Sequence, residues 1–163
     1  MTIKEIEKVI VQGLEDYLGE PNRPCPVILA NLNTPIPDYP YVAYTVTQSV
    51  VGNNGLYGIM SDGRRVKQYD CVISFTIQSD DMDEVAELAI RMVHWFNAVG
   101  RVYLSDNEIA VKNVGTVTNR DNLISVEYEY RQGLDVTFTL LDVIEASELD
   151  GDGYIEEADV KNV

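Results

Sequence analysis

The stretch that decides the fold is residues 119–138, which read NRDNLISVEYEYRQGLDVTF. After a turn-rich start, apolar and polar residues alternate along it. One parity holds Val126, Tyr128, Tyr130, Leu134, Val136, Phe138 and Leu140, and the other holds Glu127, Glu129, Arg131, Asp135 and Thr137. Because side chains on a strand point alternately to its two faces, this pattern predicts one long strand with an apolar face and a charged face.

The alternation continues through Gln132 and Gly133, so these two residues need not form a hairpin turn. We expect the glycine to permit a bend or a bulge in a strand that continues. A strand of this length with one charged face suits a surface for other subunits better than a catalytic pocket.

Three segments carry a resemblance to a known family: residues 35–41 (PIPDYPY), 118–122 (TNRDN) and 127–136 (EYEYRQGLDV). They resemble small bacteriophage neck or tail-terminator proteins, which sit between the head connector and the tail or cap the tail of phage-like particles. The similarity runs from about Leu14 to Leu141. It implies a structural subunit of a ring, usually a hexamer, located in the neck or tail of a virion. It implies no enzyme.

The remaining elements are expected around this strand. Amphipathic helices are predicted at residues 3–18, with a Thr2–Glu5 capping box, and from Asp80 or Asp81 through Val99, closed by Gly100. Strands are predicted at 27–30, 41–49, 66–78 and 109–117, with a short strand or turn at 101–104. This order predicts an α+β fold: a mainly antiparallel β-sheet with two amphipathic helices packed on one face.

Length and composition indicate how many domains the chain forms. The 163 residues, 45% of them hydrophobic and 24% charged, are typical of one globular domain. We expect a single α+β domain over residues 1–141 and an acidic C-terminal tail over 142–163. No apolar run approaches the roughly 20 residues that cross a bilayer, and the N-terminus has no signal pattern. The protein is therefore expected to be made in the host bacterial cytoplasm, without a membrane partner.

Charge argues against nucleic-acid recognition. Twelve basic residues against 27 acidic ones give a net charge of −15, and such a surface repels phosphate backbones. Two interpretations stay open: the charge keeps the protein soluble, or it lines a channel through which DNA passes without adhering.

Two loop regions are candidate contact surfaces. Residues 20–40 hold all six prolines of the chain, which predicts an extended, proline-rich arm that touches a neighbouring subunit. The turn-rich region after Gly52 is followed by Arg64, Arg65 and Lys67, three of the 12 basic residues. This loop is either a solvated hairpin tip or a flexible basic finger that meets an acidic partner or DNA.

No motif indicates catalysis. His94 is the only histidine, and it is expected on a helix surface or an interface, beside a partly buried or interface-anchoring Trp95. Cys25 and Cys71 are expected as free thiols, with Cys71 in the core. The chain has neither a phosphate-binding loop nor a nucleophile elbow. We therefore assign no catalytic, cofactor-binding or metal-binding residues.

The C-terminal residues 148–159 resemble the calcium loop of EF-hand and dockerin proteins. Oxygen ligands would come from Glu148, Asp150, Asp152, the Tyr154 carbonyl and Asp159. Glu148 stands where the first aspartate is usual, and Asp159 stands where a bidentate glutamate is usual. An acidic, turn-containing tail is the favoured interpretation, and whether the loop binds calcium is left open.

Two functions follow for testing. The first is a structural subunit of a phage or phage-tail-like particle, forming a ring that terminates the tail tube and joins it to the neck or connector. Its partners would be copies of itself, tail-tube and sheath proteins, and the head connector, with DNA only passing through the lumen. The second is a calcium-modulated binding module. Ring size, lumen-facing residues and the choice between a headed phage and a headless bacteriocin are left open.

The response of the protein to calcium distinguishes these two functions. We expect the size of the assembled species and its melting temperature to be the same in calcium and in a chelator, because two ligand positions of the loop, Glu148 and Asp159, depart from the usual residues. Size exclusion with light scattering and thermal unfolding measure this. Removal of residues 148–163 should leave assembly intact. A monomer whose melting temperature rises sharply with calcium would favour the binding module instead.

Overall fold

The computed structural model describes residues 2–31, 35–51, 55–124 and 127–149. Its helices are α1 (Ile3–Leu18), α2 (Met82–Asn97), α3 (Val99–Asp106) and α4 (Ala146–Leu149). Its strands are β1 (Val27–Leu29), β2 (Tyr41–Val51), β3 (Gly58–Ile59), β4 (Arg65–Ser79), β5 (Ala110–Val114), β6 (Thr118–Asn119), β7 (Asn122–Ile124) and β8 (Glu127–Ile144).

The strands form one sheet whose main path is β1-β2-β4-β8-β5, with β3 on β4 and with β6 and β7 on β8. Only the β1–β2 pair is parallel among these described pairings. The two long strands β4 and β8 pair without interruption from Arg65↔Ile144 to Ser79↔Tyr130. The predicted α+β fold with a mainly antiparallel sheet is confirmed.

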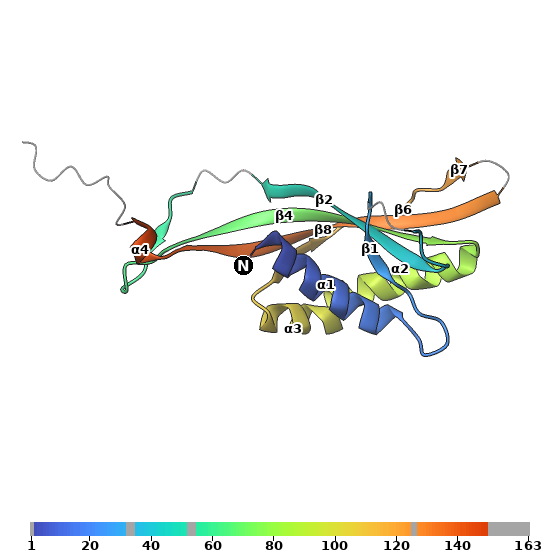
Figure 1. The fold of residues 1–163 in the computed structure, drawn as a ribbon, viewed down its shortest axis with the longest axis horizontal. Coiled ribbons are helices and arrows are strands. Elements are labelled where there is room, and N and C mark those ends of the chain that lie inside the picture. The colour runs from blue at the N-terminus through green and yellow to red at the C-terminus, as the bar shows by residue number, and fades with distance from the viewer. Residues whose placement is uncertain (1, 32–34, 52–54, 125–126, 150–163) are drawn as a thin grey trace, which may run out of the picture.

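Helices α1, α2 and α3 cover one face of the sheet, and the other face is open (Figure 1). The buried side chains of β4 and β8 point toward the helices in alternation, as predicted. An aromatic cluster lies at the centre, where the Phe96 ring is 5.2 Å from Phe75, 5.9 Å from Phe138 and 4.9 Å from Trp95. Within the described ranges, no helix is both long and apolar enough to cross a bilayer.

The helix starts follow the predicted caps. Thr2 and Glu5 form a capping box at α1, because each side chain accepts a hydrogen bond from the other's backbone N–H. Asp81 rather than Asp80 caps α2, accepting from the backbone N–H groups of Asp83 and Glu84.

The segment after α2 was predicted incorrectly. The helix ends at Asn97, and a separate helix, α3, begins at Val99 and includes the residues expected as a strand or turn at 101–104. Val99 is 61% exposed rather than in the core. Gly100 lies inside α3 instead of ending α2, and a Cβ there would be 2.2 Å from the Trp95 ring. The glycine thus lets α3 fold back closely against Trp95.

The opening stretch is also more folded than predicted. The single strand begins at Glu127, and residues before it form β6 and β7, which pair antiparallel with β8. Ile124 pairs with Glu127, so β7 runs back along the start of β8. Residues 125–126, between them, lie outside the described part. The prediction of one strand over the whole of residues 119–138 is therefore wrong, because β7 and β8 pair with each other although their residues have the composition of one continuous strand.

Gly133 marks neither a turn nor a bulge in the β4–β8 pairing. The register continues through Thr76↔Gly133, so the predicted continuation of the strand is confirmed and the bulge is not found. A Cβ at Gly133 would be 2.5 Å from the Phe75 carbonyl oxygen and 2.7 Å from Nη1 of Arg120. The glycine gives room for the arginine side chain that crosses the strand.

The C-terminal boundary lies within continuous structure. Residues 142–144, expected at the start of the tail, belong to β8 and pair with β4, and α4 follows them. Residues 150–163 lie outside the described part, so a separate acidic tail stays a prediction.

A substitution at Gly13, inside α1, tests how this helix packs against α2 and α3. A Cβ at Gly13 would lie 2.5 Å from Cε1 of Tyr103 and 2.8 Å from Cζ2 of Trp95. Alanine normally stabilises a helix by up to about 1 kcal/mol relative to glycine. Here the two rings must move, so we expect Gly13→Ala to lower the free energy of unfolding by about 1–3 kcal/mol. Urea denaturation measures this.

The matched control is Lys8→Ala, at an exposed position of the same helix, which should change stability by less than about 0.5 kcal/mol. A Gly13→Ala protein that is more stable than the wild type would show that α1 and α3 do not pack as described.

Candidate functional site

The open face of the sheet carries short polar side chains rather than free charges. Its residues on β4 and β8 alternate with the buried ones and include Asp70, Ser74, Thr76, Asp135, Thr137 and Thr139. This is the face that the sequence predicted as a charged assembly surface.

Arg120, just after β6, organises the centre of this face. Its Nη1 donates to Ser74 Oγ at 2.7 Å and to Thr76 Oγ1 at 2.9 Å, and its Nη2 donates to Asp135 Oδ1 at 3.0 Å. Hydrogen bonding from Ser74, and then from Arg120, lowers the pKa of Asp135. The guanidinium therefore ties β4 to β8 and neutralises the aspartate within the subunit.

A second carboxylate of the face is also paired. Lys112 of β5 contacts Asp70 Oδ2 at 2.5 Å, and Thr139 Oγ1 donates to Asp70 Oδ1 at 2.7 Å. Both contacts lower the pKa of Asp70, with the lysine contributing most. The open face thus presents ordered hydrogen-bonding groups whose charges are largely balanced inside the chain.

The end of the proline-rich arm lies on the same face. Tyr39 stacks on Tyr41, with ring centroids 5.8 Å apart, and donates from its hydroxyl to Glu129 Oε2 of β8 at 2.9 Å. Glu129 also accepts from Nε of Arg131 at 2.7 Å. Burial, and then the hydrogen bond to Glu129, raise the pKa of Tyr39 to about 12. The structure therefore joins two surfaces, the arm and the long strand, that the sequence suggested separately.

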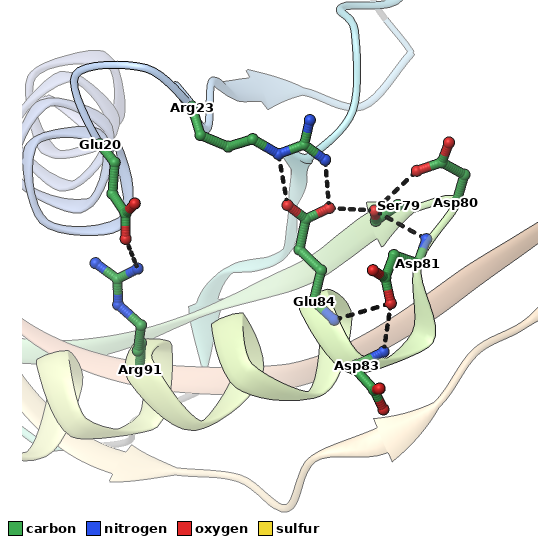
Figure 2. Close-up of polar contacts among 8 residues, drawn as sticks. All are labelled: Glu20, Arg23, Ser79, Asp80, Asp81, Asp83, Glu84 and Arg91. Atoms are coloured by element: carbon green, nitrogen blue, oxygen red, sulfur yellow. Dashed lines mark hydrogen bonds and ion pairs between the residues drawn. The ribbon is translucent and has the colours of Figure 1, made fainter.

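The beginning of the arm is pinned to the start of α2 (Figure 2). Arg23 makes a bidentate ion pair with Glu84, with Nε–Oε1 and Nη2–Oε2 distances of 2.7 and 2.8 Å. The Ser79 hydroxyl at the end of β4 donates to the same carboxylate. Hydrogen bonding from Arg23 lowers the pKa of Glu84. Arg23, 61 residues from Glu84 in the chain, thus joins the arm to the end of β4 and the start of α2 at this one carboxylate.

A second ion pair holds the end of α1 against α2. Arg91 contacts Glu20 Oε1 at 3.3 Å (Figure 2). It also donates to the Tyr17 carbonyl at 2.8 Å. Between the two pairs lies a hollow of about 250 Å³ that also reaches Cys25. Burial raises the pKa of the Cys25 thiol to about 12, so it stays protonated and unreactive. The two ion pairs hold the start of the arm against the end of α1 and against α2, and we call them the arm staple.

The structure also shows where the histidine, the tryptophan and the second cysteine singled out by the sequence lie. His94 is exposed on α2, which confirms the surface interpretation. Trp95 was expected to be partly buried or to anchor an interface, and this is wrong: it is 2% exposed, because its ring packs within the core against Phe96 and Tyr103. Cys71 is a buried free thiol, as predicted, with its pKa raised to about 11 by burial. In the part of the chain that the structure describes, no group of three or more His, Cys, Asp or Glu could hold a metal.

Only one of the proposed ligands of the calcium-like loop falls inside the described range. Glu148 lies in α4. Asp150, Asp152, Tyr154 and Asp159 lie outside the described residues, so calcium binding at this loop stays untested.

The basic loop is a folded end of the sheet where the structure describes it. Arg64 pairs with Asp62 at 2.8 Å within the turn before β4, and Lys67 lies 5.5 Å from the centre of the Tyr57 ring. Both interpretations of this loop stay open. Its exposed apolar residues had been given no role: Leu56, Ile59 and Met60.

The role of Arg120 was also missed by sequence reasoning. A usable signal was Gly133 itself, since a glycine within a strand often marks the close approach of another group. Parity then places Gly133 on the polar face. No pattern in the sequence connects it to Arg120.

Comparison with known families indicates a structural protein. The family model described as phage neck terminator protein matches residues 4–163. The match extends beyond the range of about 14–141 expected from the resemblance. A search of curated proteins found no match.

The contribution of the Arg23–Glu84 ion pair to stability is tested by lowering the pH. In the unfolded chain Glu84 takes up a proton near its ordinary pKa of 4.5, and in the folded chain it does so only at lower pH. As the pH falls through this value, the unfolded state binds more protons than the folded state. The contribution of Glu84 to the free energy of unfolding, which is present at neutral pH, is therefore lost in acid. The pair is partly exposed, so we expect about 1 kcal/mol or less from it.

The measurement is urea denaturation from about pH 7 down to about pH 3, the range in which carboxylates titrate. Glu84→Gln should lower stability at neutral pH and reduce its loss in acid. Glu87→Gln, at an exposed position of the same helix, serves as the control and should follow the wild type. An acid dependence unchanged by Glu84→Gln would contradict this role for the staple.

Proposed function

Because the chain belongs to the phage neck terminator protein family, we propose that its copies form a ring, with six subunits, that ends the tail tube and joins it to the neck. The observation that carries the proposal is the family match over residues 4–163. The family is structural and is not an enzyme family, which agrees with the buried, protonated thiols and the exposed single histidine.

The shape of the subunit supports a building role. Identical subunits close into a ring through heterologous contacts, in which two different surfaces of each subunit meet. Three surfaces are available: the ordered open face around Arg120, the stapled arm, and the end of the sheet that extends past the helices (Figure 1). Their internal ion pairs hold these surfaces in one geometry before assembly.

The proposed partners follow from the position of a terminator. The ring would contact the tail tube on one side and the head connector or neck on the other, with sheath proteins outside in a contractile tail. Its place would be the virion. A chain with a net charge of −15 suits a lumen through which DNA passes without binding.

Particle assembly without this protein tests the proposal. A tail tube built by heterologous contacts continues to add subunits until its end is blocked. We therefore expect tubes of uncontrolled length, and heads without attached tails where the particle has a head. Electron microscopy of particles gives the distribution of tail lengths.

Supplying the wild-type chain in trans should restore a single tail length, and a gold-labelled copy should mark the head-proximal end of the tail. Tails of normal length, joined to heads in the absence of the protein, would refute the proposed role.

A further inference from the structure

Helix α2 has two apolar sides. One packs on the sheet, and the second consists of Ala86, Ile90 and Val93, which lie side by side because they are four and three residues apart. Together with Val117, before β6, and Gln132 of β8, they line a hollow of about 290 Å³. Ile90 is 58% exposed at this hollow. We call it the α2 hollow.

The opposite end of the molecule carries an apolar projection. Leu56 is 94% exposed, Ile59 is 72% exposed and Met60 is 42% exposed. They lie in the connection from β2 to β4, at the end of the sheet that extends past the helix layer, whereas α2 lies toward the other end (Figure 1). We call residues 56–60 the projection. Apolar side chains gathered in this way indicate a contact surface.

The charges beside the two surfaces are opposite. The projection is followed by Arg64, which pairs with Asp62 at 2.8 Å, and by the exposed Arg65 at the start of β4. On α2, Asp83 lies three residues before Ala86 and seven before Ile90, on the same side of the helix, and it is exposed. The charge of Arg65 beside the projection and the charge of Asp83 beside the hollow are of opposite sign and therefore complement each other.

We infer that the α2 hollow of one subunit receives the projection of a second copy of this chain. Both halves of the complementary pair are present on one subunit at separate places, which favours a second copy over a different tail protein. Each subunit then uses its hollow for one neighbour and its projection for the other, and the contact repeats until a ring closes. The inference rests on the proposed function and names the contact that forms the ring.

Two charge substitutions test the pairing. Ile90→Glu disables the hollow and leaves the projection, whereas Leu56→Glu does the reverse. Both side chains are mostly exposed, so the fold should be retained, which circular dichroism and thermal unfolding check. Each variant alone should associate at least about tenfold more weakly than the wild type, because a charge enters the centre of an apolar contact. Size exclusion with light scattering measures this.

Mixing the two variants gives the sharpest result. The intact projection of the Ile90→Glu protein fits the intact hollow of the Leu56→Glu protein, so a one-to-one mixture should form a heterodimer that grows no further. Val102→Glu on α3, where the side chain is 65% exposed, is the matched control and should assemble like the wild type.

The outcomes separate the inference from the proposed ring. Rings formed by the wild type and by both variants overturn the proposed contact between the α2 hollow and the projection, and leave the proposed ring standing. So do monomeric variants whose mixture gives no heterodimer, and so does an Ile90→Glu protein that assembles normally but no longer binds tail-tube protein. A wild-type chain that stays monomeric overturns the ring and this contact together.

Discussion

The antiparallel pairing of β4 with β8 is the constraint on which the rest of this structure depends. It runs without a register shift from Arg65↔Ile144 to Ser79↔Tyr130. Since side chains alternate along a strand, a slip of one residue would turn Cys71, Phe75 and their neighbours to the open face. The core beneath the helices, the arginine crossing at Gly133 and the end of the sheet beyond the helices all require this one register.

The same pairing changes the meaning of the charged face. Acidic residues that alternate along β8 suggest free charge for docking. In the folded chain Glu129 is shared by Tyr39 and Arg131, and Asp135 is held by Arg120. Charges satisfied in this way fix the subunit's own geometry and contribute less to attracting a partner. The exposed apolar side chains on α2 and in the β2–β4 connection are therefore stronger candidates for subunit contacts than these paired charges.

Elements with a strong local signal were predictable from sequence. The capping box places the start of α1, and the alternation in residues 66–78 identifies β4 and its buried face. The predictions were wrong where contacts between residues distant in the sequence determine the local structure. Gly100 looks like a helix end, yet the Trp95 ring beside it makes it part of α3. The return of β7 along β8 was missed because it depends on pairing between strands, whose composition resembles that of one strand.

By itself, the sequence determined the α+β class, the faces of the long strands and the absence of catalytic motifs, and its resemblance to a family indicated a protein that assembles. These depend on periodicity and residue type, which are local. Only the tertiary structure decided that Arg120 crosses Gly133, that Arg23 reaches Glu84, and that α2 keeps a second apolar side uncovered. Such contacts join residues far apart in the chain, and their geometry is set by the packed sheet rather than by any neighbouring residue.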